Sequence, residues 1–122
     1  RDARLADESL RQEVAAYAMK EACYHELLKR IDQARRAGRT PGPEASVIKL
    51  VGTELKKARY DLEMRIAGTH GLGWSGAGFR EGDLETTRAW LRSRANSIEG
   101  GTSEIQLNIL AQRVLGLPKG SA

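Results

Sequence analysis

The feature that most constrains the fold is a helical repeat of apolar side chains along two long stretches of the chain. Residues 9–37 contain no proline, and their apolar side chains recur at steps of three, four or seven: Leu10, Val14, Tyr17, Tyr24, Leu28 and Ile31. Residues 43–68 repeat the pattern with Val47, Val51, Leu55, Ala58, Leu62 and Ile66. Because such spacing puts one stripe on one helix face, it predicts two long amphipathic helices. A short loop joins them, so we expect them to pack antiparallel.

Local signals indicate where these two helices begin and end. Ser9, followed by Gln12 three residues later, resembles a capping box. Gly38 stands where a left-handed C-terminal cap would sit. The loop "GRTPGPE" cannot continue a helix, and Pro43 suits the first turn of the second helix. We expect that helix to end at Gly68.

Two further helices are expected after a glycine-rich segment, "GTHGLGWSGAGFREGD", which either wraps a ligand closely or is merely mobile. The third runs from Leu84 to about Asn96 with Asp83 as its cap. Its inner side carries Leu84, Thr87, Trp90, Leu91 and Ala95. The fourth begins at Thr102 or Ser103 and ends before Gly116 and Pro118. Its inward residues are Ile105, Ile109, Leu110 and Val114.

These elements predict an all-α fold, an antiparallel four-helix up-and-down bundle, with residues 1–122 forming a single domain. No strand-like alternation or internal repeat is present. The first methionine is Met19, within the first helical stretch. We therefore expect the chain to be a piece of a longer protein, with a further partner helix absent.

Composition narrows the functional classes. A net charge of +4, with 5% aromatic residues and no block of Lys or Arg, makes a nucleic-acid surface a weak interpretation. No apolar run approaches the ~18 residues that a membrane span requires. Cys23 is the only cysteine, so an internal disulfide is impossible and a cytoplasmic location is the simpler expectation. We expect Cys23 to be buried and His25 exposed. Two histidines and one cysteine cannot supply a four-ligand zinc site, so no metal is expected.

The stretch "SIEGGTSEIQLNIL" is the strongest candidate for a functional site. Gly100 and Gly101 let the backbone approach a ligand closely, and the following helix directs free N–H groups toward the gap. With the hydroxyls of Thr102 and Ser103, this could cradle a phosphate, a ribose or an anionic ring edge. The alternative is an ordinary helix cap after a flexible turn. Glu99 could be a general base with a pKa raised by apolar surroundings, or an exposed turn residue.

Several arginines are candidates for phosphate contact. Arg65 lies one turn before the glycine-rich segment and either pairs with a phosphate or is solvated. A basic face on the third helix, formed by Arg88, Arg92 and Arg94, is open to the same two interpretations, with solvation the commoner one.

Two motifs resemble a known family. The stretch "SIEGGTSEIQLNILAQRVLGLP" closely resembles the C-terminal signature of acyl-coenzyme A dehydrogenases. The upstream stretch "PEASVIKLVGTELKKARYDLEMRIAGTHGLG" is similar to the penultimate region of that family, where a long helix ends in a glycine turn. The resemblance covers nearly the whole chain. It implies the C-terminal helical bundle of a flavoenzyme, without the first helix of that bundle and without the N-terminal and middle domains.

The resemblance also implies a cofactor, a reaction and partners. Family members remove the α-proton of an acyl-CoA with a carboxylate and transfer the β-hydride to FAD, giving a 2,3-enoyl-CoA in fatty acid metabolism. Electrons then pass to an electron-transfer flavoprotein. Thr102 and Glu104 match positions that contact FAD. Arg65, Gly68 and Thr69 match a turn that meets the adenosine-diphosphate half of a neighbouring subunit's FAD. A dimer or tetramer is therefore implied, and this chain alone should be inactive.

The catalytic base departs from the family pattern. Many members carry it directly before Gly-Thr, where this chain has Gly100, and Glu99 lies one residue earlier. The base is then Glu99, or it lies on the missing first helix, or this subunit lacks a base and pairs with an active related subunit. Two alternatives to an active dehydrogenase therefore remain: a non-catalytic structural subunit of a hetero-oligomer, and a helical interaction module.

Overall fold

The computed structural model describes residues 7–40 and 42–119, and these form four α-helices with no strand among them. The helices are α1 (Glu8–Arg36), α2 (Glu44–Ala67), α3 (Glu81–Ser93) and α4 (Ser103–Arg113). Two 3₁₀ turns connect them, Gly68–Leu72 after α2 and Arg94–Ser97 after α3. The all-α, four-helix expectation is therefore confirmed. Pro41 and the first six residues, on which the expected loop and chain start depend, lie outside the described residues.

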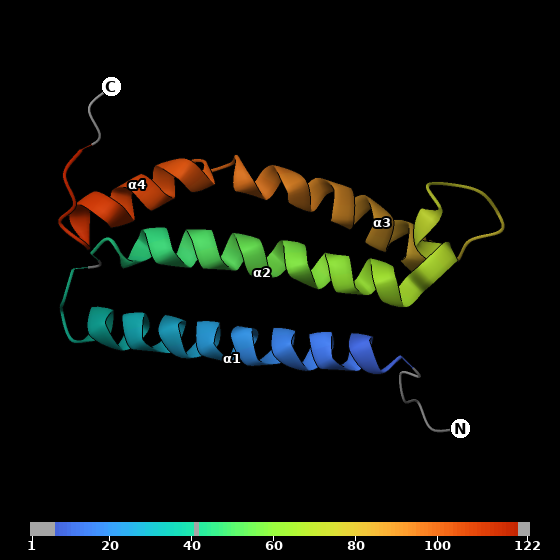
Figure 1. Cartoon of the computed structure of the whole chain (residues 1–122), viewed down its shortest axis with the longest axis horizontal. Coiled ribbons are helices and arrows are strands. Elements are labelled where there is room, and N and C mark those ends of the chain that lie inside the picture. The colour runs from blue at the N-terminus through green and yellow to red at the C-terminus, as the bar shows by residue number, and fades with distance from the viewer. Residues whose placement is uncertain (1–6, 41, 120–122) are drawn as a thin grey trace.

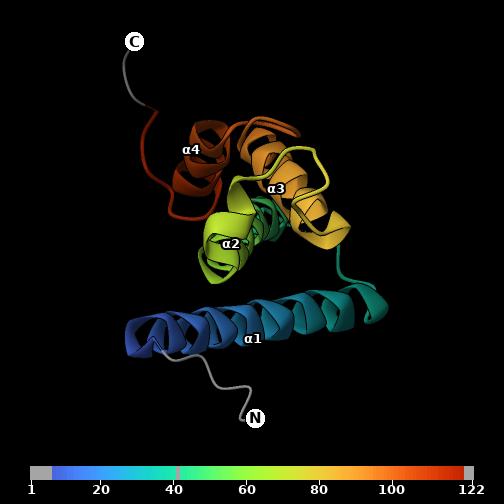
Figure 2. The same cartoon turned by 90° about the vertical axis from the view of Figure 1, so that its right-hand side faces the viewer.

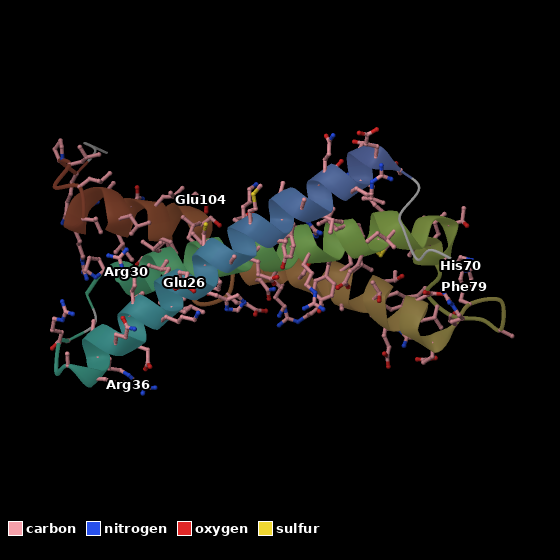
Figure 3. The ribbon with its side chains drawn as sticks, turned by 90° about the horizontal axis from the view of Figure 1, so that it is seen from below. Glu26, Arg30, Arg36, His70, Phe79 and Glu104 are labelled. Carbon is pink, nitrogen blue, oxygen red and sulfur yellow. The ribbon has the colours of Figure 1, made fainter. Side chains whose placement is uncertain are left out.

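The helix α2 is the centre of the molecule, because α1, α3 and α4 all pack against it. Figure 1 shows α1 along one side of α2 and the α3–α4 pair along the other. Viewed from below, α1 crosses α2 obliquely, so the two helices meet most closely near their middles (Figure 3). The end view in Figure 2 likewise separates α1 from the α3–α4 layer.

The topology refines the expected up-and-down arrangement. α1 and α2 run in opposite directions, and α3 turns back along α2. α4 then continues in the direction of α3 rather than reversing, since the Arg94–Ser97 turn and two glycines interrupt the helix without folding it back (Figure 1). The four helices therefore form three antiparallel rods, the third of which is broken in two.

Two predicted N-terminal caps were wrong, whereas three glycines stand at helix C-terminal ends as predicted. The α1 cap is Asp7, whose carboxylate accepts from the Leu10 N–H at 3.1 Å, and not Ser9. The α3 cap position is Arg80, so Asp83 lies inside the first turn, where its carboxylate binds the Arg80 guanidinium. Positive φ angles at three glycines end α1, α2 and α4 as expected, at Gly38, Gly68 and Gly116.

The third helix is also shorter than predicted. It begins at Glu81 and ends at Ser93, and residues up to Ser97 form the 3₁₀ turn. Thr102 caps α4, as one of the two candidates predicted, by accepting from the Ile105 N–H at 3.3 Å.

Full burial is confined to few side chains. Among the described residues, the buried apolar side chains are Leu10, Leu55 and Leu84. Four residues expected to point inward are instead exposed: Ile66, Leu91, Ile105 and Val114. Cys23 is exposed as well, which corrects the expected buried thiol, and His25 is exposed as expected. For the exposed residues on α1, α3 and α4 the cause is geometric: a helix that packs mainly on α2 buries a narrower stripe than a helix inside a closed bundle.

No helix in the described part of the chain combines the length and the apolar character needed to cross a membrane.

Candidate functional site

The turn between α3 and α4 is built from two glycines that no other residue would replace easily. Gly100 has φ +65° and Gly101 has φ +97°. The backbone would be strained at these angles in any residue that carries a side chain. A Cβ on Gly101 would also lie 2.7 Å from Nε2 of Gln106, whereas a Cβ on Gly100 would meet open space. The backbone path of the turn therefore requires glycine at both positions.

Two side chains hold the carbonyls of this turn. Gln106, a buried residue of α4, donates from Nε2 to the Gly100 carbonyl at 3.1 Å. Lys49, a half-buried residue of α2, donates from Nζ to the Gly101 carbonyl at 2.6 Å. The turn is thus tied both to the helix that follows it and to the central helix. Consecutive peptide planes are fixed from inside the protein, which leaves the opposite edge of the turn available.

Glu104 lies in the first turn of α4 with its side chain exposed. A hydrogen bond with the Thr102 hydroxyl, its own backbone N–H and the charge of Lys49 together hold the pKa of Glu104 below its usual range. The positive end of the α4 dipole acts in the same sense. Glu104 is therefore an ionised hydrogen-bond acceptor directly beside the glycine turn.

Glu99 does not lie in apolar surroundings, contrary to one of the two interpretations of its sequence position. Its side chain is 52% exposed, and Arg92 of α3 pairs with it at 2.6 Å. It also borders a shallow groove of about 360 Å³ whose polar lining includes Lys49, Lys56 and the Tyr24 hydroxyl. The other interpretation, an exposed residue at a turn, matches what the structure shows of its environment.

The second set of candidate residues lies at the far end of α2. Arg65, in the last turn of α2, pairs with Glu13 of α1. Gly68 has φ +57° and an exposed backbone, with nothing near the position of a Cβ. Thr69, which follows in the 3₁₀ turn, is also exposed. A ligand could therefore reach all three positions, although an anion at Arg65 would compete with Glu13.

The glycine-rich segment after α2 is an ordered turn at its start. Gly71 and Gly73 are buried, and a Cβ on Gly73 would lie 2.5 Å from the Phe79 ring. Thr87 of α3 donates its hydroxyl to the Gly71 carbonyl at 3.1 Å. Close packing accounts for these two glycines, because a Cβ would meet Met64 of α2 at Gly71 and Phe79, in the loop before α3, at Gly73.

The structure does not bring the two candidate sets together within one chain. The glycine turn contacts α2 at Lys49, and Arg65 lies about 16 residues further along the same helix. At a rise of ~1.5 Å per residue, about 24 Å separates them. In Figure 3 the labelled side chains of Glu104 and His70 lie far apart along the molecule, and His70 belongs to the turn that contains Gly68 and Thr69.

The basic face of α3 is satisfied within the chain. Arg88 pairs with Glu81 and donates to the Trp74 carbonyl. Arg92 pairs with Glu99. Arg94 pairs with Asp61 of α2 at 2.5 Å and lies over the ring of Trp90, whose indole N–H donates to the same carboxylate. These contacts give each arginine a structural role that sequence spacing alone does not reveal.

The two residues that hold the carbonyls of the turn, Lys49 and Gln106, were not predicted from the sequence. In the sequence, Lys49 has the pattern of an ordinary charged surface residue between Ile48 and Leu50. Its hydrogen-bond partner, the Gly101 carbonyl, is distant in sequence. Gln106 reads as the polar side of α4, yet it is buried while its neighbours Ile105 and Leu107 are exposed. A signal was present for Gln106 alone: it follows the Gly-Gly-Thr turn within one helical turn, which puts it within reach of the turn carbonyls.

Comparison with known proteins gives a family. Residues 2–115 match the family described as acyl-CoA dehydrogenase, C-terminal domain. Acyl-CoA dehydrogenase IpdE1 of Mycolicibacterium smegmatis is 39% identical over 79 residues, which are 65% of this chain and 19% of that protein. Acyl-CoA dehydrogenase FadE34 of Mycobacterium tuberculosis is 32% identical over 93 residues, which are 76% of this chain and 12% of that protein.

The chain therefore spans about a fifth or less of the curated relatives it matches. No solved structure matches it. The family match covers nearly the whole sequence, including both candidate sets of residues and all four helices. This chain belongs to the acyl-CoA dehydrogenase family, as a C-terminal domain of that family.

Proposed function

We propose that this chain is the FAD-contacting and oligomerising domain of a dehydrogenase that oxidises an acyl-CoA to the 2,3-enoyl-CoA. In that reaction a carboxylate would remove the α-proton, and FAD, when bound, would supply the acceptor for the β-hydride. The observation that carries the proposal is the Gly-Gly-Thr turn, with its carbonyls held by Lys49 and Gln106 at the start of α4.

The chemistry of the turn favours the ring end of the cofactor over its phosphates. Thr102 supplies a hydroxyl, and Gly100 and Gly101 let a flat ring approach the backbone without obstruction by a Cβ. Glu104 is ionised, so it accepts hydrogen bonds and would repel a pyrophosphate. A flavin ring edge carries both donors and acceptors and is uncharged, which suits this combination.

The other set suits the adenosine-diphosphate half. The guanidinium of Arg65 matches a pyrophosphate, and the exposed backbone at Gly68 and Thr69 allows close approach. Because about 24 Å of α2 separates this set from the glycine turn, we propose that each FAD is held by two copies of the domain, in a dimer or tetramer. A hetero-oligomer with a related subunit would meet the same requirement.

The proposed base is Glu99, which lies next to the glycine turn and borders the groove beside it. The ion pair with Arg92 restrains the orientation of this carboxylate. Replacing Glu99 by Gln in the dehydrogenase should lower turnover by about a hundredfold or more while flavin binding stays unchanged. Arg92→Gln, which frees the carboxylate without removing it, is the matched control.

A second candidate function is a structural subunit that completes the flavin site of an active partner. Two observations favour it: Gly100 occupies the position where the family carries its base, and Glu99 is turned to Arg92. Here Glu99→Gln would leave turnover unchanged, and activity would appear only with the partner subunit present. For either function, we propose that acyl-CoA is the substrate, that an electron-transfer flavoprotein accepts the electrons, and that the protein is cytoplasmic.

The experiment that tests the proposal is a flavin spectrum of the purified protein that contains this domain. We expect oxidised flavin absorbance close to one flavin per chain, and bleaching when an acyl-CoA is added without oxygen. A colourless protein that takes up no flavin would contradict it. A yellow protein that no acyl-CoA bleaches, alone or with a related subunit, would contradict the dehydrogenase activity while leaving flavin binding in place.

A further inference from the structure

We propose that Lys49 is a positioning residue that sets the orientation of the flavin-contacting turn through its hydrogen bond to the Gly101 carbonyl. The inference rests on the proposed function, since it concerns the turn assigned to the flavin ring. Lys49 itself lies on α2 and touches the turn from inside the protein. Lys49 also lines the groove beside Glu99, but the role proposed here is exerted through the backbone that it holds.

The contact of Lys49 differs in kind from those of other lysines whose ion pairs are defined. Lys29 and Lys57 pair with glutamates three residues away on their own helices. Lys49 instead donates a hydrogen bond of 2.6 Å to a neutral backbone oxygen that is 52 residues away in sequence. Its side chain is half-buried. A charged donor makes a stronger hydrogen bond than a neutral one. Such a bond ties the turn to the central helix of the domain.

The geometry of a trans peptide transmits this contact. Carbonyl and N–H of one peptide unit point in opposite directions, and the described residues contain no cis peptide. With the Gly101 carbonyl directed at Lys49, the Thr102 N–H points away from α2. Gln106 acts in the same way on the preceding unit, so the Gly101 N–H is fixed as well. Lys49 and Gln106 thereby orient two adjacent donors, the N–H groups of Gly101 and Thr102, toward the open edge of the turn.

The glycines make this support necessary. Gly100 and Gly101 have no side chain to restrict their rotation, and both adopt positive φ angles. Without Lys49, the peptide between Gly101 and Thr102 can rotate at low cost. Its N–H would then no longer have one direction. A lysine at this place converts a permissive turn into an ordered one.

The first arm of the test uses the chain itself, labelled for NMR. Lys49→Met keeps the length of the side chain but removes its charge and donors, whereas Lys49→Arg keeps both. We expect Lys49→Met to shift the Gly101 carbonyl carbon and the Thr102 amide proton, and Lys49→Arg to restore both toward wild type. Lys57→Met, on the same helix but paired with Glu54, is the matched control and should leave both resonances in place.

The second arm measures flavin binding by the protein that contains the domain. We expect Lys49→Met to weaken binding about tenfold, the scale of one lost charge-assisted hydrogen bond. Lys49→Arg should bind within about threefold of wild type. If Lys49→Met does not fold, Lys49→Gln, which keeps a neutral donor on a shorter stem, replaces it in both arms.

The two arms separate failure of the inference from failure of the proposed function. If the wild-type protein binds flavin and Lys49→Met binds it equally well, the positioning role is overturned and the proposed function stands. Unchanged resonances in Lys49→Met also overturn it. If the wild-type protein binds no flavin, the proposed function fails. The NMR arm still decides whether Lys49 orients the turn.

Discussion

Gly100 and Gly101 are neighbours with the same backbone requirement and different surroundings. Both have positive φ, so any side chain at either position strains the backbone. A Cβ at Gly101 additionally meets the amide of Gln106, which cannot move away without losing its bond to the Gly100 carbonyl. The second glycine therefore carries a packing constraint that the first does not.

Alanine at each position separates these two effects. Gly100→Ala should lower the free energy of unfolding by about 1 kcal/mol through backbone strain alone. Gly101→Ala should lower it by about 3 kcal/mol, because the lost Gln106 bond adds to the strain. Urea unfolding of the variants in wild-type and Gln106→Ala backgrounds provides the measurement. In the second background the gap between the two alanines should close; a gap that persists would show that Gln106 is not the obstacle.

At this scale the sequence predicted the chemistry of the turn better than its support. The glycines, the Thr102 cap and the exposed Glu104 could be predicted, because each depends on residues within one helical turn. Lys49 and Asp61 could not, because their partners lie 52 and 29 or more residues away. Contacts between distant segments depend on how the helices cross, and no local pattern encodes that crossing.

One contact between α1 and α2 depends on a glycine that lets a tyrosine approach closely. The Tyr24 hydroxyl of α1 donates to the Ile48 carbonyl of α2 at 3.3 Å. It fits there because the next turn of α2 carries Gly52, where a Cβ would lie 2.5 Å from the hydroxyl oxygen. A glycine within a helix lowers the stability of the helix by ~1 kcal/mol relative to alanine. At Gly52 this loss accompanies the close packing of Tyr24.

Gly52→Ala should therefore destabilise the chain despite its better helix propensity. We expect the free energy of unfolding to fall by about 1 kcal/mol, since the clash with Tyr24 outweighs the propensity gain. In a Tyr24→Phe background, which removes the obstructing oxygen, the same change should be neutral or stabilising. Thermal unfolding of the four proteins tests this, and stabilisation by Gly52→Ala in the wild-type background would refute the close contact.

One carboxylate of α2, Asp61, binds both Trp90 of α3 and Arg94 of the turn that follows α3. Burial raises the pKa of Asp61, but the hydrogen bonds from Trp90 and Arg94 and the charge of Arg94 outweigh that effect, so its pKa lies below the ordinary value of 3.8. A depressed pKa in the folded state stabilises the fold above the unfolded-state pKa. That stability is lost as the pH falls through the lower folded-state value.

Asp61→Asn should therefore weaken the pH dependence of stability as well as stability itself. We expect a loss of about 1 kcal/mol near pH 7, kept small because the side chain is half-exposed and screened by solvent. Below about pH 3 the difference between variant and wild type should shrink. Urea unfolding at both pH values measures it. Because Asp83 and Glu104 also have lowered pKa values, only the difference between the two proteins is informative. An equal difference at both pH values would exclude this role for Asp61.

The helices themselves were predictable, and their exposed faces were not. Apolar stripes and glycine caps define α1 and α2 to within about two residues, since both signals are local. Ile105 and Val114 share a stripe that should face a core, yet both are exposed. The periodicity shows which side of α4 is apolar, but whether that side is covered depends on neighbours outside the helix.

Across the whole molecule, the long central helix sets the distance between the two candidate sets. Lys49 holds the glycine turn near the start of α2, and Arg65 lies in its last turn. A straight helix of this length cannot bring its ends together (Figure 1). Under the proposed function, one copy of the domain would therefore offer two separate half-sites. Our account therefore requires that a complete flavin site combine two copies.

Mixing two defective variants tests that requirement most directly. Arg65→Ala and Thr102→Ala should each abolish tight flavin binding when every subunit carries the same change. If each flavin lies between Arg65 of one copy and Thr102 of another, co-expressed mixed oligomers contain sites with both defects and sites with none. We predict that mixed oligomers recover tight flavin binding in about half of their sites, as two-fold symmetry dictates. No recovery in mixed oligomers, with each variant folded, would contradict the account.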